Sequence, residues 1–246
     1  MSGTDYQSDT LNAFTPEPSE ARRVVVLISG SGSNLQALID AQHHDALGGR
    51  IVAVISNQTN AYGLKRAREA GIDAVALPHQ EYDSREAYDG ALIKVIERHE
   101  PDLLVLAGFM RILTPRFVNR FLGRMLNIHP SLLPDYPGLH THARALADGV
   151  TTHGCSVHFV TEQLDGGPVA LQAEVAVAED DTQESLKAKV QAREHLIYPI
   201  AVRWFLEGRL QLRGDSASID DVTLPPGGMR LSHADAAEEL DEDQEL

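Results

Sequence analysis

The fold of this chain is decided by the stretch Val24-Val25-Val26-Leu27-Ile28-Ser29-Gly30-Ser31-Gly32-Ser33-Asn34. Its first five residues are apolar and mostly β-branched, which is typical of a strand buried on both faces of a sheet. The glycines that follow allow a sharp turn, and residues 34–42 carry leucine and isoleucine at helical spacing. A buried strand, a glycine-rich turn and a helix in this order predict the first unit of a parallel α/β sheet.

The same alternation continues along the chain. Strands are predicted at residues 51–55, 74–77, 103–107 and 125–128, and helices at residues 61–70 and 84–98. After Gly154 the pattern changes, with strands at 156–160, 169–177 and 210–212 and a long helix at 182–207. Strands that alternate with helices indicate βαβ units wound right-handed around a parallel sheet. We therefore expect a Rossmann-like α/β fold: a mostly parallel sheet flanked by helices, with antiparallel additions after about residue 154.

Composition excludes several classes of protein. The chain has 246 residues, 43% of them hydrophobic, which is enough to bury one α/β core. No apolar run approaches the roughly 20 residues that cross a bilayer, and the N-terminus lacks the basic start and apolar stretch of a signal peptide. The single cysteine, Cys155, leaves no internal disulfide pair. We expect a cytoplasmic protein in which Cys155 is a small buried apolar residue.

The net charge of −15 argues against nonspecific binding to nucleic acid or to an anionic membrane. Part of this excess is local, since residues 235–245 contain many acids and no base. We interpret residues 1–21 as a flexible N-terminal extension, residues 22–231 as a single domain and residues 232–246 as an acidic disordered tail. No nucleic-acid or membrane partner is expected.

The turn at residues 29–34 is a candidate anion site. In an open parallel sheet, ligands bind beyond the carboxyl ends of the strands, and the start of a helix presents free N–H groups and a partial positive charge to an anion. Ser33 and Asn34 add donors that a bare turn would not need, so the segment predicts a phosphate cradle, with a tight turn as the alternative. It lacks the third glycine of a dinucleotide-binding fingerprint and the lysine of a Walker loop.

A second candidate site lies at the end of the strand predicted at 125–128. Residues two apart on a strand face the same way, so Asn127 and His129 would point together into the crevice. An amide can donate to an oxyanion and an imidazole can exchange a proton near neutral pH; alternatively, both side chains satisfy turn carbonyls. Asp165, before two glycines, is ordinary turn chemistry by itself. Beside His129 it would instead orient the imidazole and hold it protonated.

Histidines are concentrated between residues 129 and 158, at positions 129, 140, 142, 153 and 158. If the segment around His140 and His142 is extended, its two imidazoles lie on one side, as in some metal sites. No H-x-x-x-H or H-E-x-x-H spacing and no cysteine pair accompanies them. We therefore predict no metal site.

Several segments that occur in the same order resemble one family. They are ISGSGSNLQ at 28–36, DSRE at 83–86, LAGFMRIL at 106–113, NIHPSLLP at 127–134, YPGLHTH at 136–142, SVHFVT at 156–161, LDGGP at 164–168 and QAREH at 191–195. From about residue 24 to residue 226 the chain resembles the phosphoribosylglycinamide formyltransferases, the folate-dependent enzymes of purine synthesis. Ser31 stands where the family more often has Asn or Arg, which leaves the neighbouring residues of the cradle intact.

The resemblance implies an activity and a catalytic group. It implies a formyltransferase fold and transfer of a formyl group from the co-substrate 10-formyltetrahydrofolate to the amine of glycinamide ribonucleotide (GAR), with no metal. Asn127 and protonated His129 would stabilise the oxyanion, while Asp165 would orient His129 and assist proton transfer.

The resemblance also implies the residues that bind the two substrates. Those for GAR would be Gly32, Ser33, Asn34 and Glu194. Those for the folate would be Arg85, Met110, Arg111, Ile112, Leu113 and Asn127. The partners implied are these two small molecules, with a homodimer as one candidate assembly.

Two other functions remain open at this point. A related folate enzyme could give the formyl group to water, as a deformylase, or to methionyl-tRNA; the Ser33-Asn34 cradle argues against the first and the acidic charge against the second. A non-catalytic nucleotide- or folate-binding module would be expected to lack one of Asn127, His129 and Asp165, and all three are present.

Overall fold

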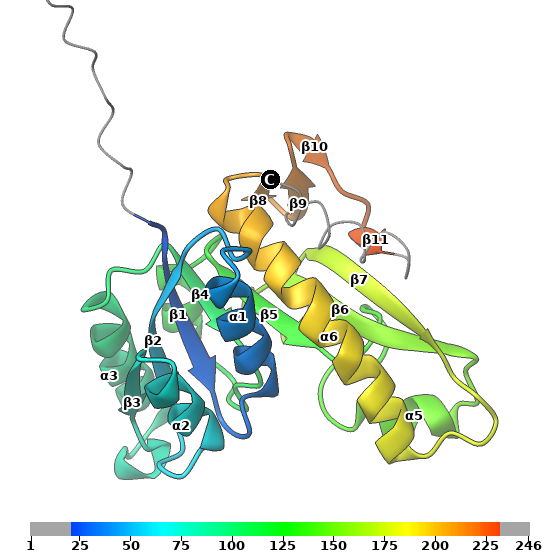
Figure 1. Ribbon diagram of the computed structural model, residues 1–246, viewed down its shortest axis with the longest axis horizontal. Coiled ribbons are helices and arrows are strands. Elements are labelled where there is room, and N and C mark those ends of the chain that lie inside the picture. The colour runs from blue at the N-terminus through cyan, green and yellow to red at the C-terminus, as the bar shows by residue number, and fades with distance from the viewer. Residues whose placement is uncertain (1–20, 232–246) are drawn as a thin grey trace, which may run out of the picture.

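The strand β1 (Arg23–Ile28) lies inside an eight-stranded sheet in the order β11-β7-β6-β5-β4-β1-β2-β3 (Figure 1). The computed structural model describes residues 21–231, so the predicted N-terminal extension, apart from Ala21, and the predicted acidic tail lie outside the described residues. The other strands of this sheet are β2 (Arg50–Ser56), β3 (Asp73–Ala76), β4 (Leu103–Leu106), β5 (Met125–His129), β6 (Thr152–Phe159), β7 (Val169–Ala176) and β11 (Met229–Leu231).

The pairing of the strands confirms the predicted fold class. β1 runs parallel to both β2 and β4, with Val26 opposite Val54 on one side and Val105 on the other. β3 and β5 extend the parallel part at its two ends. β6 then pairs antiparallel with both β5 and β7, and β11 adds a short parallel edge to β7. The sheet is thus mostly parallel in its first half, with antiparallel strands added after residue 151.

Helices cover both faces of the parallel half. α1 (Ser33–His43), α2 (Tyr62–Glu69) and α6 (Gln183–Leu206) pack on the face that takes Val24, Val26 and Ile28. α3 (Arg85–Glu97) and α4 (Pro115–Arg120) pack on the opposite face, against Val25 and Leu27. Figure 1 shows α6, in yellow, running beside α1 on the near face. Because β1 is covered on both sides, its sequence is continuously apolar instead of alternating.

The two longer predicted helices after residue 60 begin where their capping residues indicate. The Ser84 hydroxyl accepts from the Ala87 N–H at the start of α3, and Thr182 and Ser185 form a reciprocal capping box at the start of α6. These side chains satisfy N–H groups that have no partner within the helix. The predicted strands at 74–77 and 169–177 are each shifted or shortened by one residue, in β3 and β7.

Several short elements were not predicted. They are α4, α5 (Thr141–Ala147), the 3₁₀ turn η1 (His79–Glu81), and the strands β9 (Ser216–Ile219), β10 (Val222–Thr223) and β11. β9 joins β10 and the predicted strand β8 (Leu210–Arg213) in a separate three-stranded sheet. Elements of two to seven residues are too short for hydrophobic periodicity to reveal them.

The two faces of β5, β6 and β7 are covered in different ways. On one face, apolar side chains that include Ile128, Cys155 and Val157 pack in the same core as α6. Cys155 is completely buried, as predicted. The opposite face carries two polar rows across paired strands, Asn127 with His158, and His129 with Ser156 and Gln172. Loops supply hydrogen bonds to the second row, whereas Asn127 bonds to His158 and His158 to the Phe159 carbonyl.

None of the helices between residues 21 and 231 is both long enough and apolar enough to cross a membrane.

The sheet is also held by Tyr198 of α6, which gives a test of its stability. Its buried hydroxyl lies 3.0 Å from the carbonyl oxygens of both Leu106, at the end of β4, and Leu126, near the start of β5, and shares its one proton between them. We expect Tyr198→Phe to lower the free energy of unfolding by about 1–3 kcal/mol, because buried acceptors lose their donor.

The measurement is denaturant unfolding at neutral pH. Tyr62→Phe is the matched control, because Tyr62 is 50% exposed. Its free energy of unfolding should stay within about 0.5 kcal/mol of the wild-type value. Equal stability of wild type and Tyr198→Phe would show that this hydroxyl does not hold the strands together.

Candidate active site

The candidate residues meet at the carboxyl ends of β1, β4 and β5. β1 is flanked by β2 on one side and by β4 and β5 on the other, so the winding direction of the chain changes between β1 and β4. Loops that leave neighbouring strands at such a point run in opposite directions and open a crevice between them. The turn after Ile28 and the end of β5 both border this crevice.

The structure brings Asn127, His129 and Asp165 together. Asn127 and His129 lie two residues apart on one face of β5, and Asp165 reaches them from the loop after β6. The His129 Nδ1 atom is 3.5 Å from Asp165 Oδ2, and the two side chains are only 7% and 10% exposed. The same Oδ2 accepts a 2.8 Å hydrogen bond from the Gly138 N–H. The His129 Nε2–H group donates to the carbonyl oxygen of Tyr136 at 3.0 Å.

His158 completes this group, although the sequence analysis gave it no role. Its Nδ1–H donates to the Phe159 carbonyl at 2.9 Å, so its Nε2 is left to accept from the Asn127 amide at 3.0 Å. Burial lowers the pKa of His158 to about 4, even though the Phe159 carbonyl and Asp165 favour the charged form. A neutral His158 therefore fixes the orientation of the Asn127 amide. The signal for it was its alternation with Ser156 on the strand paired with Asn127.

A small cleft of about 100 Å³ opens beside Asn127. Of the residues predicted for the folate, Arg111, Ile112, Leu113 and Asn127 line this cleft. The other lining residues are Leu106, Phe109, Val118, His158, Val160, Thr161, Glu162, Gln163, Leu164 and Asp165.

The other two residues predicted for the folate, and His129, do not line this cleft. Met110 has a side chain 69% exposed, while its N–H donates to the Ser29 hydroxyl at 2.8 Å. Arg85 lies exposed at the start of α3. His129 is buried behind Asp165.

The glycine turn after β1 is held in a single shape by close packing. Gly32 has φ +70°, and a Cβ atom there would lie 2.7 Å from the Cα of Gly63, so only glycine fits. The Gly63 N–H donates to the Gly30 carbonyl, and the Arg66 guanidinium donates to the Ser31 carbonyl. The turn is therefore fixed through its backbone, and the side chain at position 31 is exposed.

The residues predicted for GAR converge just after this turn. Ser33 begins α1 and accepts a 2.6 Å hydrogen bond from Gln191, while the Asn34 amide donates to Glu194 at 2.9 Å. Burial raises the pKa of Glu194, and the hydrogen bond from Asn34 opposes that effect. Within the described residues no side chain caps the first turn of α1. Its N–H groups thus suit an anion such as a phosphate.

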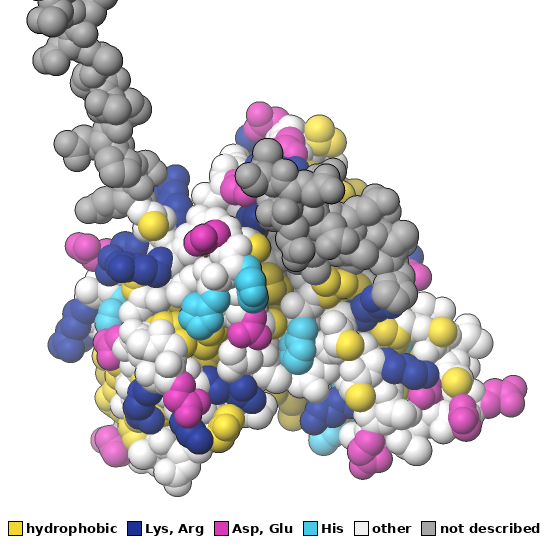
Figure 2. All heavy atoms as spheres, viewed as in Figure 1, with side chains coloured by type: hydrophobic (Ala, Val, Ile, Leu, Met, Phe, Trp, Pro, Cys, Tyr) yellow, Lys and Arg dark blue, Asp and Glu magenta, His cyan; other side chains and the backbone are white. Residues whose placement is uncertain are grey.

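A second cavity adjoins the start of α1 on its outer side. It has about 380 Å³ and is lined by Ser33, Gln36, Ala37, Asp40, Arg66 and His195. Figure 2 shows histidine side chains gathered over α1 and α6, with acidic and basic groups interspersed around them. Arg66, which lines this cavity and bonds to the Ser31 carbonyl, places a positive charge beside the turn, although the net charge of the protein is −15.

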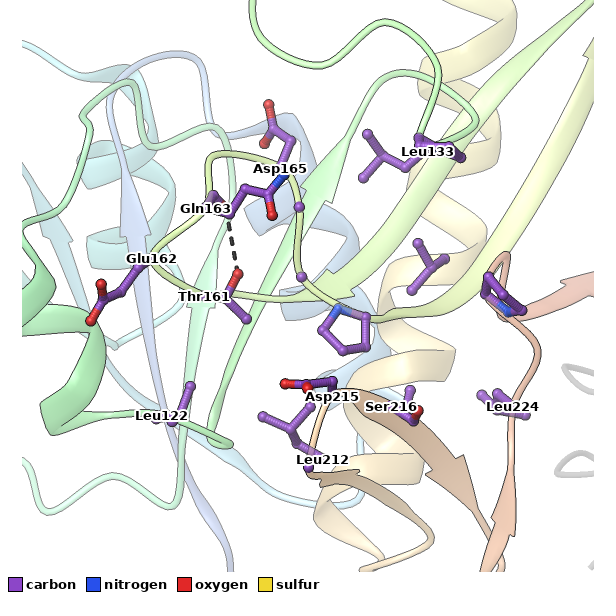
Figure 3. Close-up of a pocket in the computed structure, with 18 of the residues that line it drawn as sticks. Leu122, Leu133, Thr161, Glu162, Gln163, Asp165, Leu212, Asp215, Ser216 and Leu224 are labelled. Carbon is purple, nitrogen blue, oxygen red and sulfur yellow. Dashed lines mark hydrogen bonds between the residues drawn. The ribbon is translucent and has the colours of Figure 1, made fainter.

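The loop that carries Asp165 separates the small cleft from a larger cavity of about 770 Å³ (Figure 3). Leu212, Asp215 and Leu224 line the far side of this cavity, and Figure 3 shows the Asp165 carboxylate turned away from them. The carboxylate therefore serves the side of the loop where His129 lies.

The segment around His140 and His142 is not extended, so the condition considered for two imidazoles on one side is not met. His140 has a left-handed backbone conformation and precedes α5, and His142 lies in that helix with its ring 5.4 Å from the ring of His153. Burial lowers the pKa of His142 to about 4 and lowers that of His153 as well. In the part of the chain that the structure describes, no group of three His, Cys, Asp or Glu side chains is arranged to hold a metal ion.

Comparison with known proteins gives consistent results. A family model described as formyl transferase matches residues 22–202. The phosphoribosylglycinamide formyltransferase of Escherichia coli strain K12 is 56% identical over 205 residues, which is 83% of this chain and 97% of that protein. A solved structure of the phosphoribosylglycinamide formyltransferase of Coxiella burnetii is 49% identical and has a TM-score of 0.83, covering 87% of this chain and all of that one. The glycinamide ribonucleotide transformylase 1 of Symbiobacterium toebii is 48% identical, with a TM-score of 0.80, 82% of this chain and 95% of that one.

The neutral state of His158 predicts a pH effect on folding. The unfolded imidazole takes up a proton below pH 6.5, whereas the native one does so only near pH 4. Acidification between these values favours the unfolded chain, and this group alone can remove up to about 3 kcal/mol of stability. We expect the free energy of unfolding of His158→Gln to fall less steeply with acidification than that of the wild type. The difference in slope should correspond to at most one fewer proton taken up on unfolding.

Unfolding curves at several pH values measure this difference. His43→Gln is the control, because its imidazole is exposed in the native protein and should leave the wild-type pH dependence unchanged. Parallel curves for wild type and His158→Gln would mean that native His158 takes up its proton as readily as the unfolded chain does.

Proposed function

The chain belongs to the formyl transferase family, and we propose that it transfers the formyl group of 10-formyltetrahydrofolate to the amine of GAR in the crevice between β1 and β5. The products are formyl-GAR and tetrahydrofolate, and the reaction is a step of de novo purine synthesis. The observation that carries the proposal is the meeting of an amide, an imidazole and a carboxylate at the end of β5, across the crevice from an uncapped helix start.

The first step is attack of the GAR amine on the formyl carbon. A C–N bond forms, and negative charge develops on the formyl oxygen. The Asn127 amide has two N–H donors, of which one is held by His158, so the other is available to the oxyanion. Protonated His129, which lies behind Asp165, would add its positive charge to the stabilisation of the oxyanion. One such donor contributes about 2.7–4 kcal/mol to lowering the barrier.

The second step is collapse of the tetrahedral intermediate. The bond from the formyl carbon to N10 of the folate breaks, and a proton lost by the attacking amine ends on N10. Asp165 assists this transfer directly or through water, and its negative charge pairs with protonated His129. The Gly138 N–H fixes one carboxylate oxygen, which orients Asp165 toward His129.

Binding of the two anionic substrates relies on local groups. The GAR phosphate would sit at Gly32, Ser33 and Asn34, where the start of α1 is uncapped within the described chain. Glu194, held by Asn34, would contact another part of GAR. The folate would enter the cleft lined by Arg111, Ile112 and Leu113. Met110 and Arg85 would contact the part of the folate that projects from this cleft.

The setting of the reaction is also a proposal. Residues 22–231 would act as one catalytic domain, with both chain ends outside it. A cytoplasmic location agrees with a single buried thiol and no disulfide. The homodimer stays a prediction from the sequence.

The first test measures tetrahydrofolate formation by purified protein with and without GAR. We expect product only when GAR is present, because its amine is the acceptor. Equal product in both samples would identify a deformylase that uses water. Folate binding with no turnover in either sample would identify a binding module.

Asp165→Asn tests the proton-transfer role. Because the amide keeps the shape of the carboxylate but carries no charge, we expect kcat to fall by about 100-fold or more while KM for GAR stays within about threefold. Steady-state kinetics measure both quantities. Asp215→Asn is the control, because Asp215 lies across the larger cavity from this loop, and its kcat and KM should match those of the wild type. Equal losses in kcat and in GAR affinity would refute this role for Asp165.

A further inference from the structure

The buried amide of Gln172 has no place in the chemistry proposed above. Gln172 lies on β7, two strands from His129, and is 1% exposed. It faces away from α6, on the side where its neighbour Glu174 is exposed. Its Nε2 group donates to the Leu133 carbonyl at 2.8 Å and to the Ser156 hydroxyl at 2.9 Å. One donor of this buried amide thus reaches the loop that follows β5, and the other reaches Ser156 on β6.

Ser156 extends this contact to more of the loop. Its hydroxyl donates to the Ser131 carbonyl at 2.6 Å and accepts from the Leu133 N–H at 3.0 Å, as well as from Gln172. A hydroxyl has one donor and two acceptor positions, so every hydrogen-bonding position of Ser156 is filled. The Ser131 hydroxyl in turn donates to the Asp135 carbonyl. Main-chain groups of Ser131 and Leu133 are therefore held from β6 and β7, and the loop itself holds the Asp135 carbonyl.

The same loop continues directly to the catalytic pair. The Tyr136 carbonyl accepts the Nε2–H of His129, and the Gly138 N–H donates to Asp165. Tyr136 has φ +52°, so its carbonyl direction depends on a conformation that the chain adopts only when its flanks are fixed. His129 thus donates one hydrogen bond to this loop and Asp165 accepts one from it, while Ser156 and Gln172 hold the other end of the loop.

We propose that Gln172 is a positioning residue for formyl transfer. Through Leu133 and Ser156 it sets the loop at residues 131–138, and the loop sets the separation and orientation of His129 and Asp165. Gln172 touches neither substrate. This inference rests on the proposed function, since it assigns Gln172 to the geometry of that reaction.

Gln172→Met is the decisive variant, because methionine keeps the length of the side chain and removes both hydrogen bonds. We expect kcat to fall by about 10- to 100-fold, as when a group that orients a catalytic residue is lost. KM for GAR should stay within about threefold, since the loop contains none of the cradle residues at the start of α1. The pH profile of kcat should also change, because the loop no longer fixes the Tyr136 carbonyl on His129 and the Gly138 N–H on Asp165.

The titratable groups that surround His129 define what else could move this profile. They are Asp165, His158 and His153 on or beside β6, and His142 on α5. None of them contacts Gln172 in the hydrogen bonds described above. Glu174→Gln, on the same strand and face but paired with Arg230 at the surface, is the matched control and should keep the wild-type kcat and pH profile.

The outcomes separate the two proposals. Wild-type protein without GAR-dependent turnover would overturn the proposed function itself. With an active wild type, a folded Gln172→Met that keeps kcat and the pH profile would overturn the role of Gln172. A loss of kcat that only follows the fraction of folded protein, with an unchanged pH profile, would also overturn it.

Ser156→Ala provides the second variant, and decides the question if Gln172→Met does not fold. It should show the same fall in kcat and the same movement of the pH profile. In the double variant the two losses should be strongly non-additive, because both act through one loop. Full additivity would place the two side chains in separate roles and refute the proposal.

Discussion

The two faces of β5, β6 and β7 are covered unequally, and this determines where polar side chains and loops must lie. A strand presents alternate side chains to two faces, and a buried polar group is stable only when it is hydrogen-bonded. α6 covers one face with apolar contacts, so that face carries residues such as Ile128 and Val157. On the other face α4 packs over the start of β5, at Met125, and beyond that contact the strands carry amide, imidazole and hydroxyl groups. Loops must run over this face to satisfy them, and in doing so they become the walls of the active site.

Local groups allow a strongly acidic protein to bind the two anionic substrates proposed above. Its net charge of −15 produces repulsion at long range, but salt screens charges beyond about 10 Å. What a bound anion meets is the uncapped start of α1, with the Arg66 guanidinium on the adjacent Ser31 carbonyl. At the other side of the crevice, the Arg111 guanidinium stacks 4.7 Å from the ring of Tyr88, which holds it beside the cleft. Attraction is thus provided by a few fixed groups, whatever the overall charge.

The sequence was sufficient for the parts that depend on local patterns. Buried strands such as β1 and capped helices such as α3 were predicted to within a residue or two, because their apolar runs and capping residues are contiguous. The pairing of Asn127 with His129 followed from their spacing on one strand. The position of Asp165 beside His129 did not, because it depends on a loop that returns across β6. His158 and Gln172 were missed for the same reason: their partners are on other strands, and only the sheet register brings them together.

The burial of Cys155 has a practical consequence for observing this sheet in motion. It is the only thiol in the chain, it lies next to Ser156 on β6, and its side chain faces the core beneath α6. Burial raises its pKa, so the thiolate that reacts with alkylating reagents is scarce in the closed protein. Modification of the thiol then requires β6 to separate from α6, so the rate of modification measures how often this opening occurs. The native thiol therefore reports how often the sheet beneath the proposed catalytic residues opens, without an introduced label.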